Sequence, residues 1–533
     1  MVQHATPTLN SATADERGET TRTSLLELLH PDGNSNQSLV IGSNSPAVLL
    51  PVPRAQDDKY ADLVILAPTV TECRTSGWLE EAAQSLAQKL ETDGVAYVLA
   101  PPRWRSRVKS LLRRHGLAIG PPILHLPNRA SSRYLVPLTA VPAQYAFSKL
   151  LPLPPWGRRL AMIGLRLPAV QKLLGDLLPS AGFVAHRPGG RPLFDWLFQL
   201  DHGGQQPGSA VISSSWRGQD GAVVLHRFPG RDAQPSAIAK MNLTATMAGD
   251  RVAEAATLAR LGPSARSAGA EVPEPLLLGQ INDHPVLLQT VVCGRPMASL
   301  LAARPKRLLE HMDLLVAWLE RWNRSTVAIR PLDLGLLDRE LLAPATLLAP
   351  LLERGREYRD WLTERCAAVA GMPVPLVATH NDLTMRNVFL MEQGRLGVID
   401  WDGAREEGFP LVDFLYAMTD AAAAARGYVD RPKAFEACFV PGGVYAKAVT
   451  RFLGRLRCAV EIPDEVAELC FHACWLQHAA NEHRLGRSHG LGPFFEMVQR
   501  LHRRRFNAWM GCLGGPGSAR NGSELRENQL KPN

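Results

Sequence analysis

The stretch HNDLTMRN, His380–Asn387, together with LGVIDWD, Leu396–Asp402, decides how the second half of this chain folds. Transfer of a phosphoryl group needs a carboxylate that accepts the proton of the attacking hydroxyl, and oxygen ligands for the magnesium that neutralises the triphosphate. Asp382, Asn387 and Asp400 supply this set of side chains. Because Asp400 ends an apolar run, we expect it at the end of a buried strand, where a side chain is rigidly placed.

Three motifs follow one another in this region. The chain reads HNDLTMRN, then IDWD at Ile399–Asp402, then GFPLVD at Gly408–Asp413. This order resembles the aminoglycoside phosphotransferase and choline kinase family, whose pattern is H-G-D-x-x-x-x-N, I-D-W-[DE] and G-x-P-x-x-D, and Asn381 stands where the family has glycine. The resemblance implies an α+β protein kinase-like fold of two lobes, an enzyme that phosphorylates an alcohol group, and ATP and Mg2+ as cofactors.

The same resemblance assigns roles to single residues. It implies that Asp382 is the catalytic base and that Asn387 and Asp400 hold the metal. It also implies that Asp413 supports the catalytic loop through backbone hydrogen bonds, and we expect His380 to support the same loop. Any one of these acids alone is equally typical of a turn or a helix cap. A chain with all three motifs can also keep the fold as a pseudokinase without turnover.

A lobe that binds nucleotide is expected before these motifs. PSAIAK, Pro235–Lys240, alternates small and apolar residues before a lysine, as does the V-A-I-K strand whose lysine contacts the α and β phosphates, so Lys240 is the candidate. The helical pattern of residues 250–262 offers Glu254 as the acid that holds the lysine ammonium. Residues 274–294 predict a hairpin that leads to a hinge, whose backbone from Gln289 to Val292, including Val291, would meet adenine.

The loop that covers the phosphates is the least specific element of this lobe. VISSSWRGQDGAVVLHRF, Val211–Phe228, holds Gly218 and Gly221 but no G-x-G-x-x-G motif. Ser214 and Ser215 offer hydroxyl and backbone N–H groups to phosphates. Serine and glycine are equally typical of an ordinary hairpin turn that binds no phosphate, so both interpretations are open.

Residues 36–141 alternate strand-like and helical patterns. The runs SLVI, ADLVILAP, GVAYVLAPP, GLAIGPPILHL and SRYLVPL predict strands, and residues 77–90 and 105–116 predict amphipathic helices between them. This alternation indicates an α/β domain with an open, mostly parallel, Rossmann-like sheet. The order of elements resembles the carboxyl half of class I methyltransferases.

The methyltransferase-like pattern is incomplete. A cofactor site needs a glycine-rich first turn and an acid about twenty residues later, after a second strand. Here Asp62 already opens the next recognisable strand after Gly42, so one strand–helix unit is missing. We therefore expect a degenerate domain that has lost S-adenosylmethionine binding and acts as a scaffold, a partner dock or a substrate-presenting module. Residual S-adenosylmethionine binding, with Asp57, Asp58 or Asp62 at the ribose, is the alternative.

A length of 533 residues predicts more than one domain. We expect a disordered tail at 1–35, the methyltransferase-like domain at 36–141, a Pro-, Gly- and Arg-rich helical linker at 142–206, a kinase-like N-lobe at 207–292, a C-lobe at 293–513 and a disordered tail at 514–533. The chain shows no signal peptide, and no apolar run is long enough to span a membrane, which predicts a cytoplasmic location.

Eight cysteines without paired spacing predict reduced thiols. Cys470 and Cys474 lie one helical turn apart near His472 and His478, a spacing that fits either a metal site or, more commonly, core packing.

The 59 Lys and Arg exceed the 51 Asp and Glu and give a net charge of +8. These basic residues are not accompanied by a nucleic-acid-binding motif or by interspersed aromatic residues, so we expect no nucleic-acid partner. The basic amphipathic segment Leu160–Leu178 predicts either a helix packed against the kinase or a peripheral contact with an anionic membrane or a glycan precursor.

The partners expected for the site are ATP and an unidentified small-molecule acceptor. Residues 421–510, on the side expected to bind the acceptor, carry thirteen Lys and Arg against eight Asp and Glu. A polycationic aminoglycoside needs an acidic pocket, so we expect a neutral or anionic acceptor such as a sugar, a glycan or a lipid precursor. Choline would need an aromatic cage, for which Phe471, Trp475, Phe494, Phe495 and Trp509 are candidates if they do not belong to the core. A pseudokinase scaffold in a polysaccharide or envelope assembly is the alternative from another functional class.

Overall fold

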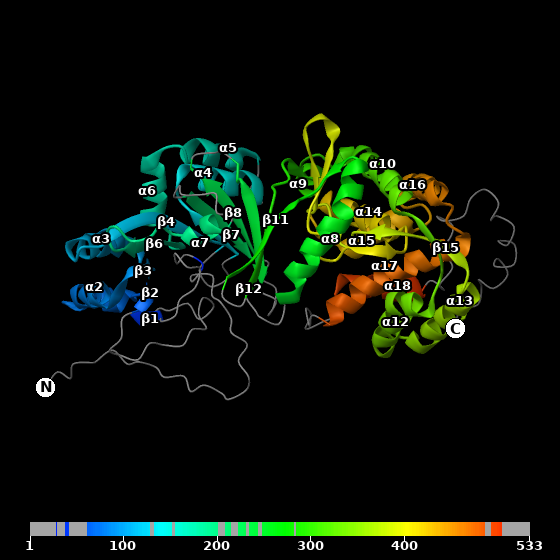
Figure 1. Ribbon diagram of the computed structural model, residues 1–533, viewed down its shortest axis with the longest axis horizontal. Coiled ribbons are helices and arrows are strands. Elements are labelled where there is room, and N and C mark those ends of the chain that lie inside the picture. The colour runs from blue at the N-terminus through cyan, green and yellow to red at the C-terminus, as the bar shows by residue number, and fades with distance from the viewer. Residues whose placement is uncertain are drawn as a thin grey trace, which may run out of the picture. The chain divides into compact units, whose positions relative to one another are not determined.

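The computed structural model describes residues 28, 38–41, 61–127, 133–151, 155–200, 208–214, 222–230, 234–242, 248–281, 284–484 and 492–503, and the other residues are drawn in grey (Figure 1). The predictions for the tails (Leu28 apart), for Gly42, Asp57 and Asp58, and for the turn at residues 282–283 lie outside these residues. The chain divides into two compact units, one formed by residues 1–255 and 275–291 and the other by residues 256–274 and 292–533. It passes between the units within helix α8 (Ala248–Ser267), after Glu274 and after Val291.

The first unit is built on one sheet of eleven strands in the order β1-β2-β3-β6-β4-β5-β7-β8-β9-β12-β11 (Figure 1). The strands are β1 (Ser38–Ile41), β2 (Ala61–Leu66), β3 (Leu90–Val98), β4 (Ala118–Leu126), β5 (Tyr134–Pro137), β6 (Ala181–His186), β7 (Gly208–Ser214), β8 (Ala222–Pro229), β9 (Ala237–Asn242), β11 (Pro275–Ile281) and β12 (His284–Gln289).

Parallel pairing in this sheet is confined to β1, β2 and β3. All other strand pairs in it are antiparallel. The prediction of a mostly parallel, Rossmann-like sheet is therefore wrong beyond β3. The reason is β6, which comes from the segment 142–206 predicted as a helical linker and inserts antiparallel between β3 and β4.

The sheet continues without a break from the strands predicted for the N-terminal domain to those predicted for the kinase-like N-lobe. Strand β5 pairs with β7, with Leu135 opposite Ile212, and the Ser214 N–H donates to the Arg133 carbonyl at 2.8 Å. Strands β7, β8, β9, β12 and β11 then follow as antiparallel neighbours. One antiparallel pair thus joins the two predicted regions through the backbone.

Helices cover both faces of the sheet in the first unit. They are α1 (Val70–Arg74), α2 (Trp78–Lys89), α3 (Arg105–Arg114), α4 (Ala140–Tyr145), α5 (Pro155–Gly164), α6 (Pro168–Leu177) and α7 (Asp195–Gln199). Because strand side chains alternate between faces, Val64 and Val98 pack with α1, α2 and α3, whereas Leu63 and Tyr97 pack in a second core with the aromatic residues of α7. The second core extends along the sheet as far as β12.

The second unit is mostly helical. Its helices are α9 (Met297–Ala303), α10 (Leu308–Thr326), α11 (Leu334–Leu337), α12 (Ala343–Leu348), α13 (Gly355–Val369), α14 (Val412–Ala424), α15 (Arg431–Phe439), α16 (Ala446–Val460), α17 (Asp464–Arg484) and α18 (Pro493–Arg503). Its strands are β10 (Ala270–Glu271), β13 (Arg295–Pro296), β14 (Ala328–Pro331), β15 (Pro373–Thr379), β16 (Val388–Leu390), β17 (Leu396–Val398) and β18 (Arg405–Gly408). They form one sheet in the order β10-β17-β16-β13 and another in the order β14-β15-β18.

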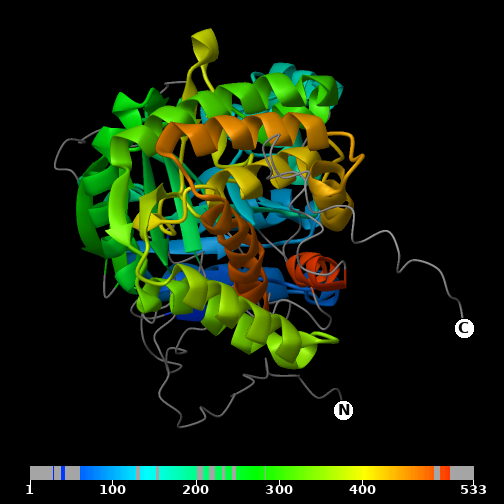
Figure 2. The ribbon, with the colours of Figure 1, turned by 90° about the vertical axis from the view of Figure 1, so that its right-hand side faces the viewer.

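Buried aromatic residues and one multivalent arginine hold the helices of this unit together. Trp318 and Trp322 on α10 stack at 4.9 Å between ring centroids, and Trp322 meets the edge of Trp401. Helices α10 and α16 run side by side (Figure 2), and Arg455 of α16 binds both Asp313 and Glu320 of α10 at 2.6 Å. Among the helices that the structure describes, none has the length and apolar character needed to cross a membrane.

Candidate active site

The HNDLTMRN stretch forms the loop between β15 and β16, and Asp400 follows β17. All three residues of β17 are buried, and the register of β16 with β17 places Val388 opposite Val398. The Ile399 N–H then donates to the Asn387 carbonyl at 3.0 Å. The short β16–β17 pair therefore brings the end of the loop close to Asp400, as the apolar pattern predicts.

Asp413, at the start of α14, holds the beginning of the loop. Its two carboxylate oxygens accept the backbone N–H groups of His380 at 2.7 Å and Asn381 at 2.8 Å. Asn381 has a φ of 63°, a left-handed conformation that asparagine tolerates better than most residues. Burial raises the pKa of Asp413 to about 6, and the two N–H donors oppose this rise. The loop support predicted for Asp413 is present in the hydrogen bonds.

His380 ties the loop to the strand that carries Asp400. Its Nδ1 accepts the Asp382 N–H at 3.3 Å, so the proton lies on Nε2, which donates to the Ile399 carbonyl at 3.0 Å. The ring also packs on the edge of Trp401, with 5.0 Å between centroids. Because its partners lie on both sides of the site, this one side chain fixes the spacing between Asp382 and Asp400.

Asp382 and Asn387 contact each other directly. The Asn387 Nδ2 donates to Oδ2 of Asp382 at 2.9 Å and to its backbone carbonyl at 2.9 Å. Burial, together with the nearby carboxylates of Asp400, Asp402 and Asp420, raises the pKa of Asp382 to about 8, against the lowering effect of the Asn387 hydrogen bond. A carboxylate with this affinity for protons is suited to accept one from a substrate hydroxyl.

Asn387 and Asp400 fit a shared magnesium site. The Asn387 amide nitrogen is engaged by Asp382, which leaves its amide oxygen as the atom for a cation. Asp400 has a φ of 72°, a strained conformation of the kind that clusters at functional sites. The part of the chain that the structure describes has no cluster of three His, Cys, Asp or Glu side chains able to hold a metal. Two protein ligands suit Mg2+, which completes its octahedron with water and substrate phosphates.

Asp420 is a site residue that the sequence motifs do not identify. It is fully buried in α14 and accepts the Met385 N–H at 2.8 Å, the Tyr428 hydroxyl at 3.0 Å and Arg431 Nη2 at 2.8 Å. Met385 lies between Asp382 and Asn387, so Asp420 fixes the second half of the loop as Asp413 fixes the first. The sequence feature that points to it is a single acidic residue within the apolar run FLYAMTDAAAA, because a buried charge needs hydrogen-bond partners.

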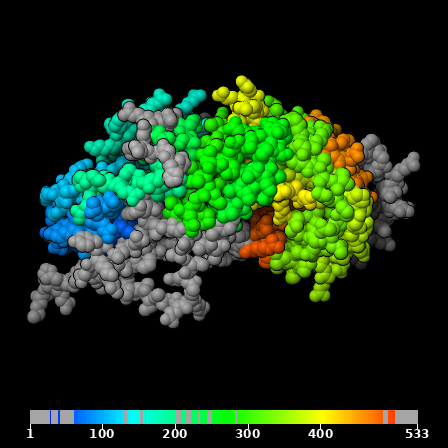
Figure 3. Space-filling model, in the orientation of Figure 1, coloured from blue at the N-terminus to red at the C-terminus, as the bar shows by residue number. Residues whose placement is uncertain are grey.

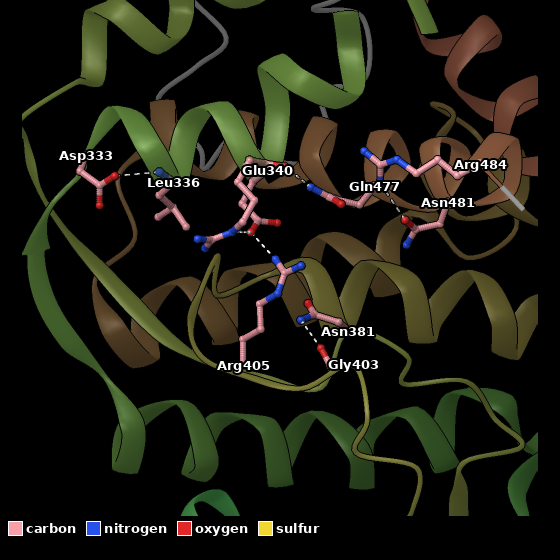
Figure 4. Close-up of polar contacts among 10 residues, drawn as sticks. Asp333, Leu336, Glu340, Asn381, Gly403, Arg405, Gln477, Asn481 and Arg484 are labelled. Carbon is pink, nitrogen blue, oxygen red and sulfur yellow. Dashed lines mark hydrogen bonds and ion pairs between the residues drawn. The ribbon is translucent and has the colours of Figure 1, made fainter. Parts of the chain in front are cut away.

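A polar network lies beside the start of the loop (Figure 4). Asn381 Nδ2 donates to the Gly403 carbonyl at 2.9 Å. Glu340, with a side chain only 10% exposed, forms ion pairs with Arg339 and with Arg405, which precedes α14. Gln477 of α17 donates to the Arg339 carbonyl at 2.6 Å. The network links the turn after α11, the segment after Asp400 and helix α17.

The predicted lysine and its acid partner meet in the first unit. Lys240 alternates with Ala239 and Met241 of the core, so its side chain leaves the sheet on the other face. Its Nζ donates to Glu254 Oε1 at 2.6 Å, and Arg251 binds the other carboxylate oxygen of Glu254. Lys240 is 6% exposed and Glu254 fully buried. The structure therefore brings this predicted pair together, one residue from β9 and one from α8.

The other residues predicted for the nucleotide lie in the same unit. Ser214 ends β7 and Gln289 ends β12, and within the described residues neither the buried Ser214 Oγ nor the buried Gln289 Oε1 has a hydrogen-bond partner. Val291 follows Gln289 and is the last residue of the unit. Ser215, Gly218 and Gly221 lie outside the described residues.

Cys470, Cys474 and His472 of α17 and its aromatic residues Phe471 and Trp475 are buried in the core. Cys470 is fully buried, and His472 bonds the Tyr358 hydroxyl through Nδ1 at 2.7 Å. Phe471 and Trp475 pack among Phe435 and Phe439, and Phe495 is also buried. His478 stacks on Tyr416 and on Phe494. These contacts show core packing at residues 470–475, and Trp509 lies outside the described residues.

Comparisons with solved structures find similar proteins at low sequence identity. Among solved structures, an aminoglycoside phosphotransferase in complex with GDP and kanamycin is 16% identical, with 56% of this chain and 93% of that chain covered and a TM-score of 0.35. The aminoglycoside phosphotransferase of Streptomyces rimosus ATCC10970 in complex with ADP and streptomycin is 16% identical, with coverages of 52% and 95% and a TM-score of 0.35. A putative fructosamine-3-kinase from Haemophilus somnus 129PT is 10% identical, with coverages of 58% and 96% and a TM-score of 0.37.

No curated protein sequence matches the chain. A model of one protein family does match it, over a span that contains Lys240, Glu254, the loop from His380 to Asn387, Asp400 and Asp413. Residues 218–444 match the phosphotransferase enzyme family.

Proposed function

We propose that residues 207–513 form an ATP- and Mg2+-dependent phosphotransferase that phosphorylates a hydroxyl group of a small molecule. The observation that carries this proposal is the contact between Asp382 and Asn387, in a loop held by Asp413 and Asp420. A loop fixed at both ends keeps a base and a metal ligand in one geometry, which is what phosphoryl transfer requires of a protein. A cytoplasmic location, where ATP is available, belongs to the same proposal.

Asp382 would orient the acceptor hydroxyl and take its proton. Its pKa of about 8 reflects burial and three nearby carboxylates. Mg2+ held by Asn387 and Asp400 would neutralise charge on the phosphates, and the nearby cation would also lower the pKa of Asp382. The Asn387 hydrogen bond to Asp382 keeps one carboxylate oxygen engaged and leaves the other for the hydroxyl.

Lys240 would contact the nucleotide phosphates. Glu254 binds its ammonium at 2.6 Å and is itself shared with Arg251. A buried ammonium held by a carboxylate has few rotamers, so little entropy is lost when it binds a phosphate oxygen. The adenine would be met by the backbone of residues 289–291, and the phosphates by Ser214 and Ser215.

The acceptor is proposed to be neutral or anionic, such as a sugar, a glycan precursor or a lipid precursor. Arg431, a cation bound to Asp420 at 2.8 Å, is the feature of this region that favours an anionic group. Asp420 also binds the catalytic loop, so Arg431 belongs to the loop's own network. ADP release with a panel of neutral sugars, sugar phosphates and aminoglycosides tests this preference, and a preference for aminoglycosides contradicts it.

Thermal shift of the full chain tests the nucleotide site itself. ATP with Mg2+ should stabilise the native protein more than ATP alone, and a ligand at a hundred times its Kd contributes about 2.7 kcal/mol. Asp400→Ala should lose the Mg2+-dependent part of the shift. Asp360→Ala, at an exposed acid of α13, is the matched control and should keep it. Absence of any shift in the native protein favours the pseudokinase scaffold instead.

A further inference from the structure

Helices α5 and α6, which follow each other in the chain, carry two different apolar faces. The inner face packs on the sheet: Ala161, Leu165, Leu174 and Leu178 join a core cluster that includes Val211 and Phe228. Leu165 is only 2% exposed. This inner face anchors the α5–α6 segment in the core of the first unit.

The outer face nevertheless carries six large apolar side chains, here named the outer stripe. Their exposed fractions are 69% for Trp156, 63% for Leu160, 66% for Ile163, 55% for Leu167, 55% for Leu173 and 61% for Leu177. On α5 and the residues after it, the spacing i, i+4, i+7 and i+11 places four of them in one row. The α5–α6 segment lies on the outside of the first unit (Figures 1 and 3). Such a concentration of exposed apolar side chains marks an interaction surface.

Cations accompany the outer stripe. Arg159, Arg166 and Lys172 are exposed, and none has an ion pair within the described part of the chain. The one acid of residues 155–177 is Asp176, and its carboxylate binds Lys109 at 2.6 Å. A row of Trp, Leu and Ile side chains flanked by unpaired Arg and Lys is the composition of a helix that lies in a lipid–water interface.

We propose that the outer stripe docks the protein on the surface of a membrane that contains anionic phospholipids. The apolar row enters the boundary between head groups and acyl chains, and Arg159, Arg166 and Lys172 bind the lipid phosphates. A second copy of the chain fits this surface less well, because a two-fold interface would bring these cations against their own copies. A flat anionic surface satisfies the apolar row and the cations together.

Flotation of the full chain with large unilamellar vesicles tests the proposal. The protein should float with vesicles that contain phosphatidylglycerol and much less with pure phosphatidylcholine, and added salt should reduce the bound fraction. Ile163→Ser should lower the bound fraction at least several-fold. Ile329→Ser is the matched control, since Ile329 is 62% exposed on β14, and it should bind as the native chain does.

A second pair of variants separates charge from apolar contact. Arg159→Gln with Arg166→Gln should reduce binding to anionic vesicles and leave the small binding to neutral vesicles unchanged. The proposal is overturned if the native chain does not float with anionic vesicles, or if Ile163→Ser and Ile329→Ser bind equally well. It is also overturned if the native chain is a dimer that Ile163→Ser dissociates, because the stripe then contacts a second copy.

Discussion

Asp420 accepts the backbone N–H of Met385 at 2.8 Å, and this bond joins α14 to the middle of the loop from His380 to Asn387. The same carboxylate binds Tyr428 and Arg431, so a fully buried charge is compensated by three donors. Removal of a partner from a buried charge leaves the remaining groups without compensation, which is costly.

Asp420→Asn should therefore weaken both the fold and turnover. The amide can accept fewer of the three hydrogen bonds, and hydrogen bonds to charged groups contribute about 1.5–3 kcal/mol each. We expect a lower Tm and a lower kcat with little change in KM for ATP, because Asp420 acts through the loop. Hydrogen exchange should show faster exchange of the Met385 amide, and an unchanged kcat would remove Asp420 from the positioning machinery.

Asp382→Asn should lower turnover sharply while the chain still binds ATP with Mg2+. The loss of a general base costs about 10²–10⁴-fold in rate, whereas Asn387 and Asp400 remain as ligands for the metal. Turnover is measured by ADP release, and nucleotide binding by thermal shift. If both disappear together, Asp382 holds the nucleotide rather than the acceptor proton.

Asp382 should also make stability depend on pH in the absence of metal and nucleotide. Its pKa is raised from 3.8 to about 8 in the folded chain, so its contribution to stability is complete below pH 3.8 and is lost as the pH rises toward 8. Asp382→Asn removes this dependence, and its Tm relative to the native chain should increase between pH 4 and 8. A constant difference in Tm across this range would contradict the raised pKa.

The buried triad of Lys240, Glu254 and Arg251 should respond asymmetrically to substitution. Lys240→Met leaves Glu254 paired with Arg251, so the free energy of unfolding should change little while the affinity for ATP falls. Glu254→Ala removes the buried acid that these two cations share, which costs about 3–5 kcal/mol. Urea unfolding of both variants gives the comparison, and equal destabilisation would show that Arg251 does not compensate for the lost lysine.

The sequence identifies those residues of the site that lie close to one another along the chain. Asp382, Asn387 and Asp400 lie within one loop–strand–strand segment, so short-range pattern alone predicts their proximity. Lys240 and Glu254 are brought together by the step from β9 to α8, which the change from strand to helical periodicity marks. The nucleotide-binding and catalytic roles of these residues stay predictions.

The sequence does not reveal contacts that depend on distant strands. AGFVAH has the pattern of a strand, but its place between β3 and β4 follows from pairing across the whole unit. The sequence does not identify Asp420 for a similar reason. Its hydrogen-bond donors come from the loop at His380–Asn387, from the segment after α14 and from α15.

Because β5 pairs with β7, the N-terminal region occupies an edge of β7 that would otherwise be open. A fragment that begins at residue 207 would lose the partner of β7, and the backbone N–H and C=O groups that now face β5 would form an open edge. Open edges of this kind recruit strands from other molecules, so such a fragment should aggregate even with an intact catalytic loop. The N-terminal region then protects strand β7 from pairing with other molecules.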